Sequence, residues 1–335
     1  MTRPGYQIPN FTYPGVGPAE LFEVIARQAR EADSAGFDTL LVMDHFYQLP
    51  MLGPPEAYML ECYALLSALA RETSTVRLSA LVTGNTYRNP AVLAKTVTTL
   101  DIVSGGRGQL GIGAGWFQLE HDAFGVEFGT FTDRFEKLEE ALRIIVPLLR
   151  GERVSLDGTH YRVVDAVNSP PPASRVPVMV GGSGERKTLR MVAQYADESN
   201  LTCEAQDLPR KLDALAEHCE QLGRNRADIT VSWQKSVCIA PTTAEAEAEF
   251  TAGFRARGVD FASLPDDQRA ALTARVITGD PDTVGERLAA DLARGVDGFT
   301  INAPLNGHVP GRVALLGETA ATVARAQVVG SERSG

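Results

Sequence analysis

The chain has 335 residues and a formal net charge of −10, which limits what it can do. An acidic protein is a poor candidate for binding nucleic acid or an anionic membrane surface. Its four cysteines include no C-x-x-C pair, so we expect reduced thiols rather than disulfides or a metal finger. The sequence contains neither a signal-peptide-like apolar run at its start nor the roughly 18 apolar residues of a membrane span. We therefore expect a cytoplasmic protein.

Runs of apolar and β-branched residues alternate with amphipathic helical runs along the whole chain, which favours an α/β fold with a parallel sheet. Eight strands and at least eight helices are typical of a (β/α)8 TIM barrel. The strands are expected at 6–11, 39–43, 76–82, 109–113, 177–180, 198–201, 229–237 and 298–301. The helices are expected at 19–35, 57–72, 91–103, 131–150, 185–195, 208–222, 244–257, 282–294 and 309–326.

Two stretches do not fit the repeat and are interpreted as insertions, near 152–172 and 258–280. In the first, alternating segments around a turn predict a hairpin over 154–164. The second is polar and interrupted by proline, which predicts a loop with a short helix over the site. We expect one barrel domain over 1–328 and a flexible tail over 329–335.

Asp44 and His45 follow directly on the strand at 39–43, where a barrel directs side chains into its mouth. A histidine there can donate a ring N–H to a heteroatom or carry a proton near neutral pH. The alternative is a histidine that only stabilises the loop. The five histidines form no H-x-H or H-x-x-x-H pattern, so we expect no metal site.

Glycines at 111, 113 and 115 follow the strand at 109–113 but lack the context of a dinucleotide-binding turn. We interpret Gly113 and Gly115 as letting a flat ligand approach the strand end. Glu120 and His121 follow shortly after, and they form either a second polar wall of the site or a solvated loop pair.

The turn Gly181-Gly182-Ser183-Gly184 lies between a strand and a helix, which predicts an anion site. Free N–H groups and the positive end of the helix dipole favour a phosphate there. Arg186, Lys187 and Arg190 add positive charge in the first turns. The alternative is a turn with no ligand.

Taken together, these motifs resemble the bacterial luciferase-like superfamily, and within it the branch that uses the deazaflavin coenzyme F420 in place of FMN. The likeness covers nearly the whole chain. It is carried by Asp44-His45, Leu81-Val82-Thr83, Thr86-Tyr87-Arg88-Asn89-Pro90, Gly111-x-Gly113-x-Gly115-Trp116 and Gly181-Gly182-Ser183-Gly184. The resemblance implies a luciferase-like (β/α)8 barrel, often a homodimer, with the cofactor ring in the barrel mouth.

The resemblance also implies roles for single residues. His45 would contact the deazaflavin ring or the substrate, and Thr83 would bond ring or ribityl oxygens. Ala80 and Leu81 would flank a cis peptide bond that lies against the ring. The turn from Gly181 to Gly184 would hold the phosphate, and Asp44, Gly113 and Gly115 also count as cofactor-binding residues.

One position departs from the family pattern. Several deazaflavin dehydrogenases of the family carry a glutamate directly after the glycine turn, where this chain has Trp116. This leaves His45, Glu120 and His121 as the candidate proton-transferring residues.

A reduced deazaflavin donates two electrons as hydride, so the expected activity is hydride transfer to or from a small organic substrate. Phe46, Tyr47, Trp116 and Phe117 near the site suggest an apolar or aromatic substrate, and no basic cluster for a second phosphate is evident. Two alternatives remain: an FMN-dependent monooxygenase that uses oxygen and a partner reductase, and a cofactor-binding barrel without catalysis.

Overall fold

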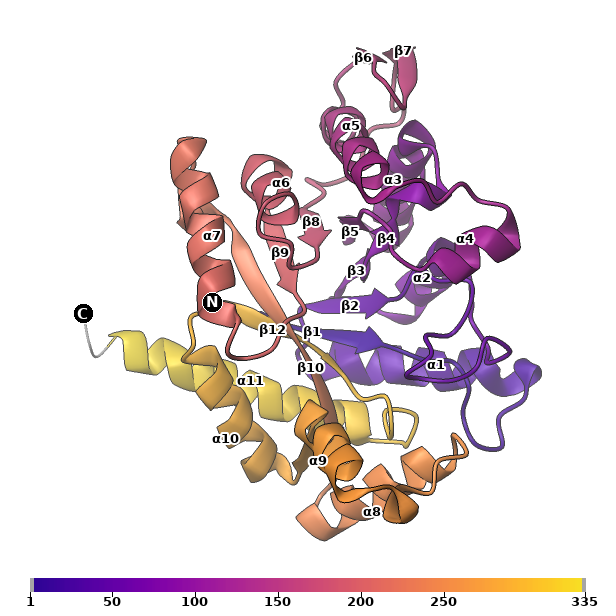
Figure 1. Ribbon diagram of the computed structural model, residues 1–335, viewed down its shortest axis with the longest axis vertical. Coiled ribbons are helices and arrows are strands. Elements are labelled where there is room, and N and C mark those ends of the chain that lie inside the picture. The colour runs from indigo at the N-terminus through magenta and orange to yellow at the C-terminus, as the bar shows by residue number, and fades with distance from the viewer. Residues whose placement is uncertain (1–2, 333–335) are drawn as a thin grey trace.

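The computed structural model describes residues 3–332 and contains a closed barrel of parallel strands (Figure 1). In barrel order the strands are β1 (Arg3–Ile8), β2 (Thr39–Val42), β3 (Arg77–Ala80), β5 (Gly108–Gly113), β8 (Val178–Gly181), β9 (Glu198–Leu201), β10 (Thr230–Ile239) and β12 (Gly298–Asn302). The barrel closes because β12 pairs with β1 and β10, and β10 pairs in turn with β9. This confirms the predicted (β/α)8 fold.

Helices surround the strands, with most of them following a strand in the chain (Figure 1). Their bounds are α1 (Pro18–Ser34), α2 (Cys62–Glu72), α3 (Pro90–Ser104), α4 (Gln118–Phe124), α5 (Phe131–Leu149), α6 (Thr188–Tyr195), α7 (Leu208–Gln221), α8 (Thr243–Arg255), α9 (Asp266–Arg275), α10 (Pro281–Leu292) and α11 (Arg312–Glu332). Short 3-10 turns lie at Asn85–Tyr87, Arg226–Asp228 and Phe261–Ser263. In the described part of the chain, none of these helices combines the length and the apolar character needed to cross a membrane.

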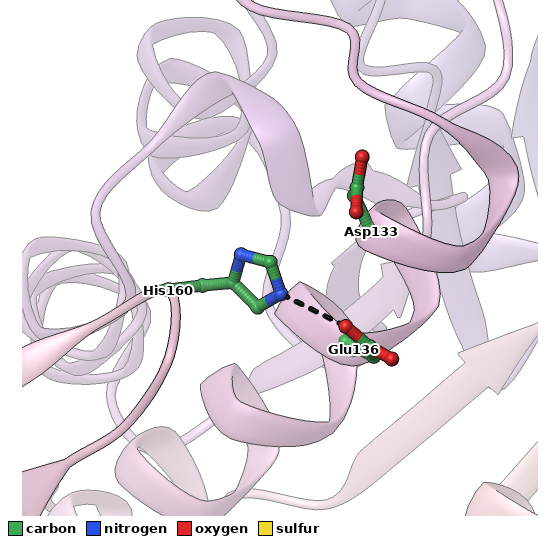
Figure 2. A group of neighbouring side chains, drawn as sticks. All are labelled: Asp133, Glu136 and His160. Atoms are coloured by element: carbon green, nitrogen blue, oxygen red, sulfur yellow. Dashed lines mark hydrogen bonds and ion pairs between the residues drawn. The ribbon is translucent and has the colours of Figure 1, made fainter.

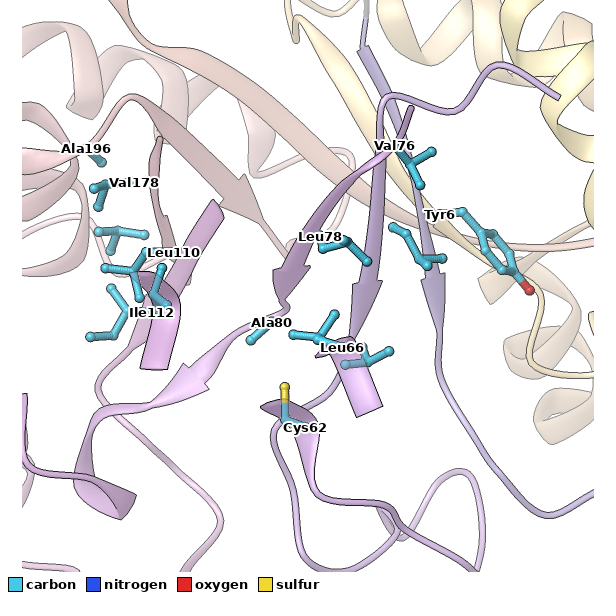
Figure 3. Packing of buried hydrophobic residues seen from close by; sticks show 14 of the residues in the cluster. Tyr6, Cys62, Leu66, Val76, Leu78, Ala80, Leu110, Ile112, Val178 and Ala196 are labelled. Atoms are coloured by element: carbon cyan, nitrogen blue, oxygen red, sulfur yellow. The ribbon is translucent and has the colours of Figure 1, made fainter. Parts of the chain in front are cut away.

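Alternation along the strands separates an apolar outer layer from a polar interior. Tyr6, Leu78 and Ile112 are fully buried in the apolar layer, where α2 also packs (Figure 3). On the opposite face of β1, Gln7 Oε1 accepts hydrogen bonds from Gln234 Nε2 at 3.0 Å and Asn302 Nδ2 at 2.9 Å. The burial of apolar side chains against the helices stabilises the barrel, while the interior below the mouth stays polar.

The first predicted insertion contains the expected hairpin, in which β6 (Val154–Asp157) and β7 (Arg162–Ala166) pair antiparallel. It projects beyond α5 (Figure 1). The Glu140 carboxylate on α5 accepts hydrogen bonds from the backbone N–H groups of Thr159, His160 and Tyr161 at 2.7, 2.9 and 2.9 Å. The hairpin turn is therefore fixed to the helix.

The second predicted insertion holds more structure than a loop with a short helix. The helix is α9, and directly after it β11 (Val276–Gly279) extends the sheet by pairing parallel with the end of β10. The polar surroundings conceal this strand in the sequence, although Val276, Ile277 and Thr278 are β-branched. A short β4 (Thr83–Gly84) also pairs with β5 and was not expected.

Several predicted helix boundaries are wrong. Helix α2 begins at Cys62 rather than near residue 57, because the Glu61 side chain caps it by accepting from Ala64 N at 2.6 Å. Helix α6 begins at Thr188, three residues later than expected. Helix α11 continues to Glu332, so the predicted tail is helical up to that residue, and the rest of it lies outside the described residues.

Candidate active site

A cavity of about 1210 Å³ opens at the carboxyl ends of the barrel strands. It is lined by loops that follow β2, β3, β5, β8 and β9 and by residues of β10. Active sites of (β/α)8 enzymes lie at this end of the barrel. Most of the predicted site residues lie here, namely Asp44, His45, Leu81, Thr83, Gly113, Gly115, Gly181, Gly182, Ser183 and Gly184.

His45 faces this cavity and is bound from behind by a buried carboxylate. Its Nδ1 lies 2.8 Å from Glu120 Oε2, and the side chains are 13% and 0% exposed, respectively. Among residues 3–332, Nε2 of His45 has no hydrogen-bond partner. Trp116 and Phe117 approach the ring edge-on, with ring centroids 5.8 and 5.9 Å away. The free ring nitrogen is therefore available to a ligand.

Glu120 does not line the cavity, because its side chain points to the back of His45. Its Oε1 accepts from the backbone N–H groups of Phe46 at 2.6 Å and Tyr47 at 2.8 Å. Its Oε2 accepts from the Tyr87 hydroxyl and is also the atom that contacts His45 Nδ1. Burial opposes ionisation, but these donors together hold the pKa of Glu120 below its usual value. The expectation that Glu120 transfers a proton to substrate is therefore not supported by its position.

His121 is also fully buried, on α4. Its Nδ1 donates to the Phe117 carbonyl at 2.9 Å, and its Nε2 lies 2.7 Å from the Thr86 hydroxyl. Both ring nitrogens are used within the protein. The solvated loop pair considered from the sequence is wrong, and His121 instead ties α4 to the segment after β3.

Asp44 is likewise engaged within the protein. Its carboxylate accepts from both terminal nitrogens of Arg88, at 2.6 and 2.9 Å, and from Gly84 N at 3.1 Å. The side chain borders the cavity but is buried. Its direct role is to connect the end of β2 to the start of α3.

The segment after β3 forms one wall of the cavity. The cis peptide bond lies between Leu81 and Val82, one residue later than the predicted position beside Ala80. Before this bond, Leu81 N donates to Val42 O at 2.8 Å, so the backbone pairing with the end of β2 reaches Leu81. Ala80 is buried in the outer apolar layer rather than in the cavity lining.

Three glycines allow the segment after β3 to pack closely against its neighbours, because a side chain at their positions would collide with Val82 or Thr86. A Cβ on Gly113 would lie 2.9 Å from Val82 Cγ2, and one on Gly181 would lie 2.7 Å from Val82 Cγ1. Gly115 has a φ of +80°, and a Cβ there would meet the Thr86 hydroxyl at 2.8 Å. Thr83 Oγ1 lies 2.6 Å from the Tyr63 hydroxyl and also borders the cavity.

The glycine turn after β8 can receive an anion. Gly182 N donates to Asn200 O at 3.1 Å, and Ser183 Oγ is paired with the backbone of Thr202, so these groups hold the turn in place. In the described part of the chain, the N–H groups of Ser183 and Gly184 make no hydrogen bond. They lie beside the cavity, just before α6, as a phosphate site requires.

The predicted basic residues are less closely involved. Arg186, Lys187 and Arg190 do not line the cavity, although Lys187 Nζ lies 5.5 Å from the ring centres of Phe131 and Phe135, which do.

The mouth combines an apolar rim with basic side chains. Trp116 is 59% exposed and Met51 77% exposed, and Leu49, Leu52, Phe131 and Phe135 complete the rim. Farther along the same cavity lie Lys235, Arg275, Arg287 and Arg294, which corrects the expectation that no basic cluster exists. Within the described chain, Arg275 and Arg287 form no ion pair, whereas Lys235 and Arg294 both pair with Asp291.

A second group of titratable side chains does not line the cavity. Figure 2 shows its three members. Asp133, Glu136 and His160 place one ligand atom each within 4.8 Å of one another. Asp133 completes the capping box of α5 with Thr130, and Glu136 Oε2 lies 3.2 Å from His160 Nε2. Helix capping and a surface ion pair account for the group, so we assign it a structural role.

Sequence reasoning missed two contributors to the site. Tyr87, in the motif after β3, bonds Glu120, and Arg134 on α5 donates from Nε to Gly115 O at 3.1 Å. Tyr87 lies in the motif Thr86-Tyr87-Arg88-Asn89-Pro90, so the sequence did point to its region. No local sequence pattern indicates that Arg134 reaches the site.

The fold and the cavity define a (β/α)8 protein with a ligand site at the strand ends. The family model for luciferase-like monooxygenases matches residues 3–298, and the chain belongs to this family. It is 30% identical over 294 residues to an F420-dependent glucose-6-phosphate dehydrogenase of Microbacterium testaceum, covering 82% of this chain and 84% of the relative. A Segniliparus rotundus protein of the same description is 29% identical over 315 residues, covering 87% and 89%.

Solved structures share the fold at lower identity. An F420-dependent secondary alcohol dehydrogenase, solved with an F420-acetone adduct, superimposes with a TM-score of 0.76 at 20% identity, over 96% of this chain and 99% of that one. A monooxygenase from Streptomyces bottropensis gives a TM-score of 0.80 at 19% identity, over 96% and 99%. These likenesses support the barrel fold.

Proposed function

We propose that this protein is an F420-dependent oxidoreductase that transfers hydride between the deazaflavin and a small organic substrate. The main support is the set of curated relatives described as F420-dependent glucose-6-phosphate dehydrogenases, which include alignments over 82% and 87% of the chain. The site agrees with this role, because a cavity with an anion-receiving turn and one accessible histidine nitrogen lies at the strand ends.

The residues present fit the cofactor. Glycines at 113 and 181 keep Val82 close to the strand ends, where a side chain at either position would collide with it. The N–H groups of Ser183 and Gly184 would hold the phosphate, and Leu81, Val82 and Thr83 would face the ring. When bound, F420 supplies a two-electron hydride donor or acceptor.

His45 would carry the proton that accompanies hydride transfer. It lies at the end of β2, borders the cavity and leaves Nε2 unpaired within residues 3–332. A positioned acid–base group at hydrogen-bond distance from the substrate is what such a reaction needs. Of the three candidates from the sequence, only His45 reaches the cavity, because Glu120 and His121 are buried behind it.

We propose a substrate with apolar or aromatic surface. The support is the exposed rim that includes Trp116, Met51 and Phe131, since large exposed apolar side chains around a cavity favour apolar ligands. A second candidate is a phosphorylated sugar. It is favoured by Arg275 and Arg287, which line the cavity without an ion pair in the described chain, and by the description of the curated relatives.

Fluorescence titration of the purified protein with F420 and with FMN tests the cofactor. We expect tighter binding of F420. FMN binding that is tighter by tenfold, or about 1.4 kcal/mol, would overturn the proposal in favour of a flavin monooxygenase. Turnover of F420 with glucose 6-phosphate and with a panel of aromatic alcohols then separates the two substrate classes. Binding without turnover of any compound would favour a non-catalytic barrel.

The homodimer implied by the family resemblance and the cytoplasmic location expected from the sequence belong to this proposal as well. Size-exclusion chromatography with light scattering would measure the oligomeric state.

A further inference from the structure

We infer that Glu120 is a positioning residue that fixes His45 in one tautomer, with hydrogen on Nδ1 and the lone pair of Nε2 directed to the cavity. The inference rests on the proposed function, in which His45 faces the cofactor and substrate. It assigns Glu120 a role different from direct proton transfer, since its carboxylate is fully buried and separated from the cavity by His45.

The donors around Glu120 decide its charge. The N–H groups of Phe46 and Tyr47 can only donate, so Oε1 must accept from both. Oε2 accepts from the Tyr87 hydroxyl, and His45 Nδ1 lies 2.8 Å from the same oxygen. Even without His45, three donors converge on one carboxylate, which is the arrangement that favours its ionised form despite burial.

The charge of Glu120 in turn decides the tautomer of His45. An ionised carboxylate accepts hydrogen bonds and cannot donate one, so the 2.8 Å contact requires a hydrogen on Nδ1. A neutral imidazole with hydrogen on Nδ1 carries a lone pair on Nε2. His45 can then take up a proton from the cavity side without first losing one, and Glu120 stabilises the imidazolium that results.

The surrounding packing keeps the carboxylate in place. Phe124 of α4 packs on Phe46 and Tyr47, with ring centroids 4.7 and 5.4 Å apart. One residue after Glu120, the His121 ring bonds Phe117 and Thr86. Helix α4 is therefore tied on both sides of Glu120, so that its carboxylate has one available position.

Glu120→Gln is the decisive variant, because glutamine has nearly the same shape as glutamate but reverses the direction of the hydrogen bond to His45 Nδ1. The amide oxygen still accepts from the two backbone N–H groups, which turns the NH2 group toward His45 and Tyr87. That NH2 group can only donate, so it forces His45 Nδ1 to become an acceptor and places the hydrogen on Nε2. In the serine protease triad, the corresponding carboxylate-to-amide change leaves the geometry intact but lowers turnover about 10⁴-fold.

The measurement is ¹⁵N NMR of the histidine side chains, with His45→Asn to assign the His45 signals, together with F420 titration. We expect Nδ1–H in the wild type, Nε2–H in Glu120→Gln, and F420 dissociation constants within about threefold of each other. Tyr87→Phe is the matched control, since it removes a donor from the same oxygen and should keep Nδ1–H.

Nε2–H in the wild type, or an unchanged tautomer in Glu120→Gln, would overturn the inference. The wild-type spectrum decides the question even where Glu120→Gln fails to fold. Failure of the wild type to bind F420 is a different result, which contradicts the proposed function and leaves the tautomer assignment measurable.

Discussion

Arg88 holds the buried carboxylate of Asp44 with both of its terminal nitrogens, at 2.6 and 2.9 Å. Arg88 also lies over the Tyr63 ring, with its guanidinium carbon 5.0 Å from the ring centre, and Tyr63 in turn contacts Thr83. The ion pair thus connects two segments that border the cavity, after β2 and after β3, with the start of α2. Asp44 directly precedes His45 in the chain, and Arg88 directly follows Tyr87, which contacts Glu120. The ion pair therefore helps to hold both His45 and Tyr87 in position.

Replacing Arg88 with Met should destabilise the protein, because it removes the cation that is paired with the buried Asp44 carboxylate. Loss of one partner of a buried ion pair costs about 3–5 kcal/mol. Urea unfolding followed by circular dichroism measures the change. The double variant Asp44→Asn with Arg88→Met should recover much of the loss, and a double variant as unstable as the single one would contradict this account.

Replacing His45 with Asn should leave F420 binding nearly unchanged but lower turnover by about 10² to 10⁴-fold, the usual contribution of a positioned acid–base group. The reason is that Asn retains polar atoms toward the cavity but cannot titrate. Steady-state kinetics across pH, with the substrate identified by the screen, provide the measurement. If the variant kept wild-type turnover and an unchanged pH profile, His45 would have no role in the chemistry and would only stabilise the loop.

Replacing Gly184 with Val should weaken F420 binding without unfolding the barrel. The new side chain would crowd Thr188 Oγ1, which lies 2.9 Å from a Cβ at this position, and cover the free N–H groups. Loss of charge-assisted hydrogen bonds to a phosphate corresponds to about 1.5–3 kcal/mol.

A deazaflavin riboside without the phosphate is the control ligand for Gly184→Val. Its affinity should be the same for wild type and variant. If F420 affinity is unchanged while the variant stays folded, the phosphate is bound elsewhere. Gly182 is less suitable for this test, because its φ of +120° makes any substitution strained.

The ionised carboxylate of Asp33 should stabilise the folded protein near neutral pH, and this contribution should be lost in acid. Partial burial opposes its ionisation, but donors from Ser74, Thr75 and Val76 hold the pKa of Asp33 well below its usual value. A depressed pKa in the folded state stabilises the protein above the unfolded-state pKa of about 3.9 and loses this effect as the pH falls further.

The variant Asp33→Ala should therefore be less stable than wild type at pH 7, with the difference shrinking steadily below about pH 4. Urea midpoints measured from pH 7 to pH 2.5 test this. A constant difference over the whole range would show that the charge of Asp33 is not responsible.

Trp116→Ala and Arg287→Ala together distinguish the two substrate classes. For an apolar substrate, the loss of Trp116 should raise KM by about tenfold or more, because a large aromatic contact surface disappears, and the loss of Arg287 should change little. A phosphorylated substrate should show the opposite pattern. KM measured for both variants with the same substrate gives the answer.

The sequence predicted the barrel well because runs of apolar and β-branched residues alternate with amphipathic helical runs along the chain. It did not predict β11, whose four residues follow a polar helix and add only an edge to the sheet. Helix α4 was also missed, since it has seven residues between two loops. Neither element carries enough periodicity to stand out.

The candidate site likewise contains residues whose position could be predicted from the sequence and one whose position could not. His45 and the glycine turn at 181–184 follow strands, so their place at the mouth could be predicted from the barrel topology. The position of Glu120 could not, because its contact with His45 joins residues 75 apart in the chain and depends on how α4 packs. The tautomer of His45 follows only from that contact.

The pairing of β1 with β12 has a consequence for biosynthesis. Gly5 lies opposite Thr300, so β1 is synthesised long before β12, and one of its edges stays uncovered until β12 has been made. A chain that stops before Gly298 leaves β1 and β10 each with an unpaired edge. Exposed strand edges recruit other chains, so prematurely ended copies of this protein should aggregate rather than accumulate as smaller folded barrels.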